Sequence, residues 1–306
     1  MHKKPTHHAS STPVDELQVR WLNTFKHRTL IFFLPHAIRR TMERPMSMRY
    51  CIRLPILLSC SLLVACATTA EQAEESSLLS LADDIAAQGD YATATTLYER
   101  AAELSDEDVN INVRLGDARL ASGDLQGALR SYRAALEKNI DSPTALLGLG
   151  STQLRLDKVE SALRNLRRAA PALDTPTAWS RLGAAQALLG VKEGEAAVSS
   201  FSRAAELLPD APDAQTNLAL AQSLAGQHAT AVAHIRDVAS SPLAEDRHFH
   251  SLILILILAG DTQQAETIEI PDMPASQRQS LIEQAQRIRA LPDIGERARA
   301  IGLAGY

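Results

Sequence analysis

A spacing of about 34 residues recurs along most of this 306-residue chain and constrains its fold more than any other feature. Asp157 and five glycines stand at steps of 33 to 36 residues (Gly89, Gly123, Gly190, Gly226 and Gly260). An alanine follows each of these six positions at nearly the same period (Ala94, Ala128, Ala162, Ala197, Ala231 and Ala265). Such self-similarity indicates a repeat protein whose units bury their apolar faces against one another.

Several units contain the residues that two closely packed helices need. A Leu-Gly pair precedes the turn position, and a large apolar residue follows it (Leu115-Gly116 with Tyr132, Leu149-Gly150 with Leu166, Leu182-Gly183 with Phe201). Glycine lets the helices approach closely, and a turn glycine ends the first helix with a positive φ angle. The pattern resembles the tetratricopeptide repeat (TPR) family. This resemblance implies an all-α superhelical solenoid of about six helix-turn-helix repeats over residues 76–270.

One turn is longer than the others. Seven steps separate Gly190 from Ala197, whereas five separate the corresponding residues of every other unit. Two residues have therefore been inserted between the helices of the fourth unit. The insertion is either a plain loop extension, which loops tolerate, or a protrusion that contacts a partner.

The end of the array is marked by an apolar run and by prolines. The run Leu252–Leu258 is too short to span a bilayer, which takes about 20 residues, so we interpret it as a buried helix of the sixth unit. Pro271 and Pro274 then break the array. Within residues 271–306, Ser276–Leu291 predicts an amphipathic capping helix, and we expect a loose tail after Pro292.

All three cysteines lie in a basic segment before the repeats. Residues 1–65 carry 10 Lys+Arg against 3 Asp+Glu, whereas residues 67–306 carry 21 against 33, a net charge of −12. An apolar stretch before Cys66 has the length of the hydrophobic region of a secretion signal. Its end, Leu63-Val64-Ala65-Cys66, resembles the lipobox of bacterial lipoproteins, which implies cleavage before Cys66 and acylation of the Cys66 thiol.

The lipobox divides the N-terminal part of the chain. Residues 46–65 form the expected lipoprotein signal peptide and residues 66–75 a lipidated tether, while residues 1–45 are interpreted as a spurious or disordered leader. An ordinary secretion signal or a short buried helix is the alternative. Ala67 follows the cysteine, and by resemblance to enterobacterial sorting this implies a lipid anchor at the periplasmic face of the outer membrane.

The chain after Cys66 lacks the patterns that catalysis and cofactor binding need. It contains no cysteine and no G-x-S-x-G, H-E-x-x-H, P-loop or Rossmann glycine pattern. Its histidines do not have metal-site spacing (His228, His234, His248 and His250). An acidic body also lacks a basic surface for phosphates. We therefore expect no enzyme, cofactor, metal, small-molecule substrate or nucleic-acid partner.

Protein binding is the class of function that these exclusions leave. The TPR resemblance implies that the first helices of the repeats line a binding groove. The groove candidates lie beside the Leu-Gly pairs or at equivalent positions (Arg114, Asp117, Arg181 and Asn217). The arginines suit acidic or backbone groups of an extended or helical segment, and their alternative is ordinary solvated side chains. The Lys/Asn carboxylate clamp of chaperone-binding TPR proteins is not reproduced.

A second resemblance concerns the last repeats. Asn217–Ala221, the turn Leu224–Gly226 and Ala265-Glu266 resemble the TadD family of Flp (tight adherence) pilus assembly proteins. This implies a membrane-anchored scaffold in Flp/tad-type pilus assembly or secretion, with a cell-envelope partner such as a secretin. The alternatives are a pilotin-like lipoprotein for a type IV pilus secretin and an outer-membrane lipoprotein that regulates a cell-wall or polysaccharide synthase.

Overall fold

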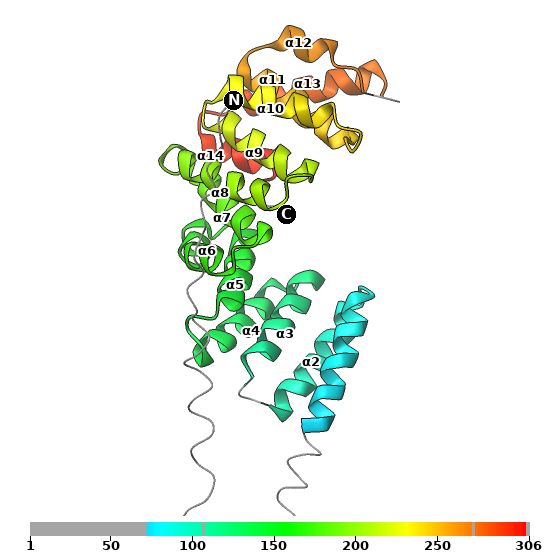
Figure 1. Ribbon diagram of the computed structural model, residues 1–306, viewed down its shortest axis with the longest axis vertical. Helices are drawn as coiled ribbons and strands as arrows, with labels where there is room; N and C mark the ends of the chain where they lie inside the picture. Colours follow the sequence, from blue (N-terminus) through cyan, green and yellow to red (C-terminus); the bar gives the residue numbers. More distant parts are fainter. Residues whose placement is uncertain (1–71, 106–107, 271–272, 304–306) are drawn as a thin grey trace, which may run out of the picture. The chain divides into compact units, whose positions relative to one another are not determined.

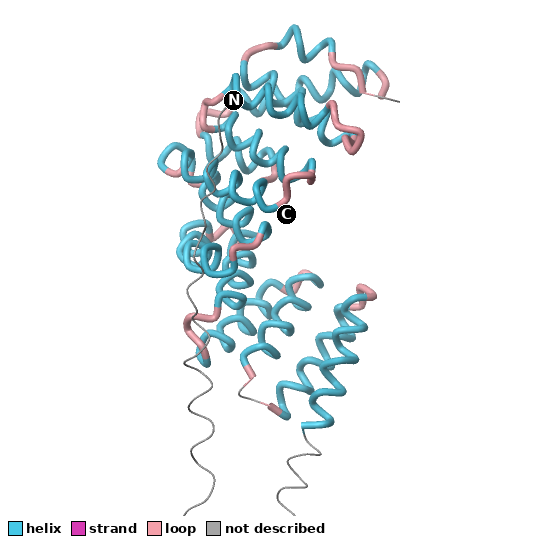
Figure 2. Tube along the Cα trace, in the orientation of Figure 1, coloured by secondary structure: helices cyan, strands magenta, loops and turns pink. Residues whose placement is uncertain are grey.

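The computed structural model describes residues 72–105, 108–270 and 273–303. Within these ranges the chain folds into helices joined by short loops, and no strand occurs there (Figure 2). All of these residues belong to one compact unit, Ala67–Tyr306. The predicted signal peptide and Cys66 lie outside the described residues. The all-α prediction is confirmed.

Six helical hairpins follow one another along the chain (Figure 1). They pair residues 72–87 with α2 (Tyr91–Leu104), α3 (Val109–Ser122) with α4 (Leu125–Lys138), α5 (Pro143–Arg155) with α6 (Val159–Leu173), α7 (Pro176–Leu188) with α8 (Gly194–Leu207), α9 (Pro212–Leu224) with α10 (His228–Ala239), and α11 (Asp246–Ala259) with α12 (Thr262–Thr267). We name the first helix of each pair helix A and the second helix B. Residues 72–75, expected in the tether, already belong to the first helix A.

The helices pack in the order of a repeat array. Each helix from α3 to α10 contacts the helix before it and the helix after it. Consecutive A helices also touch, since α3 contacts α5, α5 contacts α7, α7 contacts α9, and α9 contacts α11. The A helices from α3 to α11 therefore line one continuous surface, which is where the sequence predicts the groove.

The turn positions take the backbone conformation predicted for them. The five turn glycines have φ angles between 73° and 91°, and Asp157 in the sixth slot has a φ of 54°. Aspartate enters this left-handed region more readily than most residues because its side chain is short and polar. The left-handed stop after helix A is thus confirmed in all six units.

Tyr132 shows why glycine recurs in the A helices. Its ring is fully buried, and a Cβ atom on Gly116 or Gly148 would lie 2.6 Å or 2.1 Å from it. Gly116 belongs to the same hairpin and Gly148 to the next, so one ring fills the space between two repeats. The Tyr132 hydroxyl donates to Asp117 Oδ1 at 2.6 Å. Burial, and then the Asp117 charge, raise the pKa of this hydroxyl, which therefore remains a donor.

The apolar run of the sixth repeat lies in α11, where six of its seven residues are buried (Leu252, Ile253, Ile255, Leu256, Ile257 and Leu258). Helix α11 contacts α9, α10 and α12, and also α13 (Ala275–Ala290), which buries Ile282, Ala285 and Ile288. The buried-helix interpretation is confirmed, and α13 stands where the sequence predicts the cap. No helix in the described ranges is both long enough and apolar enough to cross a bilayer.

A further helix, α14 (Ile294–Ile301), occupies the place where we expected a loose tail. The Asp293 side chain accepts from the Glu296 backbone N–H at 3.0 Å and caps the helix, and Gly302 ends it with a φ of 85°. Helix α14 contacts α7, α9 and η1 (Gly190–Lys192), a 3₁₀ turn in the lengthened loop of the fourth repeat. A helix of eight residues between a proline and a glycine shows too little periodicity to be recognised in the sequence.

Candidate functional site

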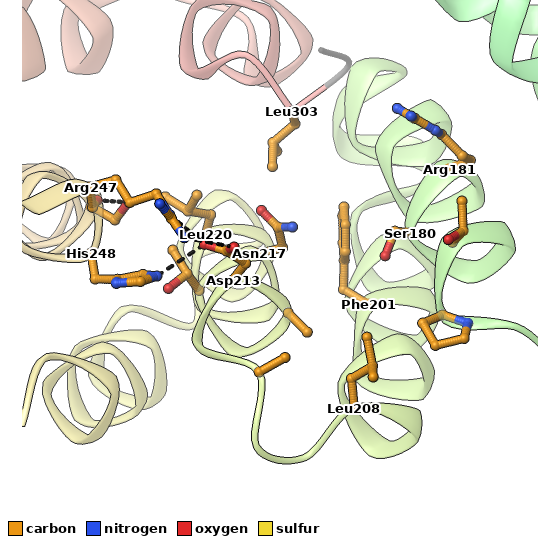
Figure 3. A pocket seen from close by; sticks show the side chains of 16 residues that line it. Ser180, Arg181, Phe201, Leu208, Asp213, Asn217, Leu220, Arg247, His248 and Leu303 are labelled. Carbon is orange, nitrogen blue, oxygen red and sulfur yellow. Dashed lines mark hydrogen bonds and ion pairs between the residues drawn. The ribbon is translucent and has the colours of Figure 1, made fainter. Parts of the chain in front are cut away.

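The A helices of the last three repeats line a pocket of about 390 Å³ (Figure 3). Its walls come from α7, α9 and α11, with Phe201 and Leu208 from α8 and its C-cap and Leu303 from the C-terminal segment. We name it the A-helix pocket. It lies on the surface where the sequence predicts a protein-binding groove.

The structure separates the four predicted groove residues into two pairs. Arg181 on α7 and Asn217 on α9 both line the A-helix pocket. Arg114 and Asp117 lie on α3 and are not part of its lining. Arg114 forms an ion pair with Asp83, and Asp117 accepts the hydroxyl hydrogen bond of Tyr132. Both residues of the second pair therefore already have partners within the first two repeats.

Among the residues that the structure describes, Arg181 is the charged group of the pocket that has no partner. Its side chain is partly buried, and among the described residues it forms no hydrogen bond or ion pair (Figure 3). Burial, and then the nearby charge of Arg155, lower the pKa of its guanidinium below the usual value. An arginine remains protonated in spite of such a shift. An acceptor oxygen that entered the pocket would compensate its lost hydration.

Other groups around Arg181 complete a mixed polar and apolar lining. Thr216 is 6% exposed, and its buried Oγ1 atom has no hydrogen-bond partner. Phe201, Leu220 and Leu303 provide apolar walls. A concave, mostly apolar site with a few polar groups is the usual form of a binding pocket.

Asp213, Arg247 and His248 form a linked cluster at one wall. The Arg247 guanidinium donates from Nε to Asp213 Oδ1 at 2.7 Å and from Nη2 to Oδ2 at 3.0 Å. His248 is 1% exposed, and its Nδ1 accepts the Glu245 backbone N–H at 2.8 Å. The His248 proton must then be on Nε2, which lies 3.0 Å from Asp213 Oδ1. Arg247, followed by His248, holds the pKa of the Asp213 carboxyl below its usual range.

The sequence contains a signal for this cluster in its repeat period. Asp213 and His248 are 35 residues apart, close to one period, so they fall at neighbouring positions on successive A helices. Metal-site spacing, which His248 lacks, gives no sign of this cluster. In the described ranges no group of three His, Cys, Asp or Glu residues is placed to hold a metal ion. His248 instead joins α11 to α9.

Replacing His248 by alanine is expected to lower the free energy of unfolding by about 2–3 kcal/mol. The change leaves a cavity and removes the acceptor of the Glu245 backbone N–H. Urea denaturation followed by circular dichroism measures the loss. Arg247→Ala is the control, because its ion pairs are exposed and such pairs contribute about 1 kcal/mol or less. Equal losses in the two variants would contradict a structural role of His248.

Comparisons with known proteins agree with this architecture. Two family models, both described as tetratricopeptide repeat, match the chain, one at residues 79–143 and 113–176 and the other at residues 212–237. A sequence search of curated proteins found no significant match.

Many solved structures match this chain, and two of them illustrate the shared fold. A tetratricopeptide repeat protein from Parabacteroides merdae is 18% identical, with a TM-score of 0.56 over 70% of this chain and 87% of that structure. PilF from Pseudomonas aeruginosa is 14% identical, with a TM-score of 0.54 over 71% of this chain and 94% of that structure. At these identities the likeness concerns the fold alone.

Proposed function

Because this chain carries tetratricopeptide repeats, which serve as protein-interaction scaffolds, we propose that it binds a protein partner in the A-helix pocket. The observation that carries the proposal is Arg181, a partly buried cation that lines the same pocket as Thr216, because neither the guanidinium nor the Thr216 hydroxyl has a partner among the described residues. A carboxylate or main-chain carbonyl oxygen of the partner would satisfy Arg181, and an apolar side chain would fill the space near Phe201 and Leu220.

The proposal includes a lipid anchor on Cys66. Residues 67–71 separate the acylated cysteine from the first described helix, and the six steps from Cys66 to residue 72 span at most about 20 Å when fully extended. The tether would keep the repeats close to the membrane surface. The placement at the periplasmic face of the outer membrane rests on the lipobox and on Ala67, as does the assignment to the cell envelope.

The pathway is proposed from sequence resemblance. The motifs from Asn217 to Glu266 that resemble the TadD family favour a scaffold in Flp pilus assembly or secretion, with a secretin or another assembly component as the partner. The likeness to PilF supports a TPR architecture for such a protein and does not extend to its activity. A cell-wall or polysaccharide synthase as the captured partner would instead favour the alternative function.

The scaffold proposal predicts that Arg181→Gln lowers partner capture by about 10- to 100-fold. This range corresponds to the loss of one hydrogen bond to a charged group. Tagged wild-type and variant proteins would be crosslinked in intact envelopes, purified, and compared by quantitative mass spectrometry.

Arg114→Gln is the matched control for this experiment. Arg114 lies at the corresponding position of the second repeat and is already paired with Asp83, so we expect its replacement to change capture less than about threefold. Both variants should keep the helical content of the wild type. Equal capture by wild type and Arg181→Gln would exclude the A-helix pocket as the binding site.

A further inference from the structure

Helix α14 lies on the helices that line the A-helix pocket. It contacts α7, η1 and α9 as well as the preceding helix α13, and α13 in turn contacts α11 (Figure 1). Leu303, just after α14, points into the A-helix pocket (Figure 3). Ala300 and Ile301 line a neighbouring pocket with Leu220 and Ser251. Since α13 already covers the last helix A, α14 is not needed to close the array.

One close backbone contact of α14 depends on glycine. A Cβ atom on Gly295 would lie 2.3 Å from the carbonyl oxygen of Leu188, the last residue of α7. No other residue could bring the two backbones so close. Ala298, nearly one turn later, is fully buried, and Leu303 is 3% exposed. The docked face of α14 is thus a row of small and apolar residues that fits the surface formed by α7, η1 and α9.

The polar contacts of α14 with the repeats are weak. Its ion pair, from Arg299 Nε to Asp157 Oδ1 at 3.1 Å, joins side chains that are 44% and 69% exposed. Exposed pairs of this kind contribute little to stability. The helix has eight residues, fewer than the about 12–15 that make even a marginally stable isolated helix. Helix α14 therefore depends on a small docking surface, which another helix can occupy in its place.

We infer that α14 occupies, within its own chain, a helix-binding surface that a helix of the protein partner takes over. This inference rests on the scaffold function proposed above. The partner helix would carry a small residue against Leu188, apolar residues in the following turns, and a basic residue opposite Asp157. A basic residue also suits a body of net charge −12. Docked in the direction of α14, the partner helix would turn its unpaired C-terminal carbonyl groups toward the A-helix pocket, which Leu303 lines.

Gly295→Ala in the full chain tests this inference, because alanine favours the helix but cannot fit against Leu188. Trypsin should then cleave after Arg297 and Arg299 at least about tenfold faster than in the wild type, as judged by mass spectrometry. A fluorescein-labelled synthetic peptide of residues 292–303 should bind Gly295→Ala at least about tenfold more tightly than the wild type, whose own α14 competes. The same peptide carrying Gly295→Ala should bind neither protein.

Gly194→Ala is the matched control. Gly194 also lies in the first turn of a helix, but a Cβ atom there would be 3.9 Å from Ala225 Cβ, an ordinary contact. Trypsin should cleave this variant at the wild-type rate, and the variant should bind the labelled peptide as weakly as the wild type does. Unchanged cleavage of Gly295→Ala, or released α14 without tighter peptide binding, would overturn the inference. A Gly295→Ala dimer in light scattering would identify a second copy as the occupant and would also overturn it. The Arg181 experiment is independent of these outcomes, so the scaffold proposal can stand if the inference fails.

Discussion

Replacing Cys66 by serine is expected to move the protein from the membrane fraction to the soluble fraction almost completely. Each buried methylene of an acyl chain contributes about 0.8 kcal/mol, and two or more chains hold a protein firmly at a bilayer. The measurement is fractionation of cell envelopes with immunodetection, together with the mass of the N-terminal peptide, which the anchor proposal expects to carry the lipid in the wild type.

Cys60→Ser is the matched control for the anchor. Cys60 lies in the same apolar segment, but a cleavage site there would leave about six residues of hydrophobic region after Arg53. We therefore expect Cys60→Ser to fractionate with the membrane as the wild type does. Membrane association of Cys66→Ser would contradict the lipid anchor. The scaffold proposal would then still be tested by the Arg181→Gln capture experiment.

The repeat fold could be predicted from the sequence because its determinants are local and recur at one period. Each turn needs a residue that accepts a positive φ, and Asp157 met this need where glycine was missing. Each hairpin needs small residues beside a large one, as Gly116 and Tyr132 illustrate. A unit whose residues depart from the repeat pattern does not hide the pattern, since the neighbouring units repeat it.

The candidate site was less predictable because its properties depend on which neighbours a side chain meets. Arg114 and Arg181 occupy corresponding positions beside Leu-Gly pairs. Arg114 forms an ion pair with Asp83, whereas Arg181 forms no ion pair with an acidic residue in the described ranges. Helix α14 returns to α7 across a long sequence separation, and its contact depends on the single glycine Gly295. A periodic pattern contains no information about such a non-repeated contact.

Replacing Tyr132 by alanine is expected to lower the free energy of unfolding of the first two repeats by about 3–5 kcal/mol. The fully buried ring contacts Gly116 in its own repeat and Gly148 in the next, so its loss opens a cavity at the boundary between the second and third repeats. Repeat arrays owe much of their stability to such nearest-neighbour interfaces. The apolar core from Leu154 to Leu303 is a separate cluster and does not include Tyr132.

Tyr132→Ala should therefore unfold in two steps. Residues 72–138 should lose protection in hydrogen exchange at a lower urea concentration than the repeats after them, whereas the wild-type array should unfold more cooperatively. Tyr132→Phe keeps the ring and loses the hydrogen bond to Asp117, which should lower the free energy of unfolding by about 1 kcal/mol. Tyr91→Ala is the control, since Tyr91 is only partly buried in the same part of the array. It should lower the free energy of unfolding by less than about 1 kcal/mol. A loss that spread evenly over all six repeats would show that the array is one cooperative unit and that the boundary at Tyr132 is not its weak point.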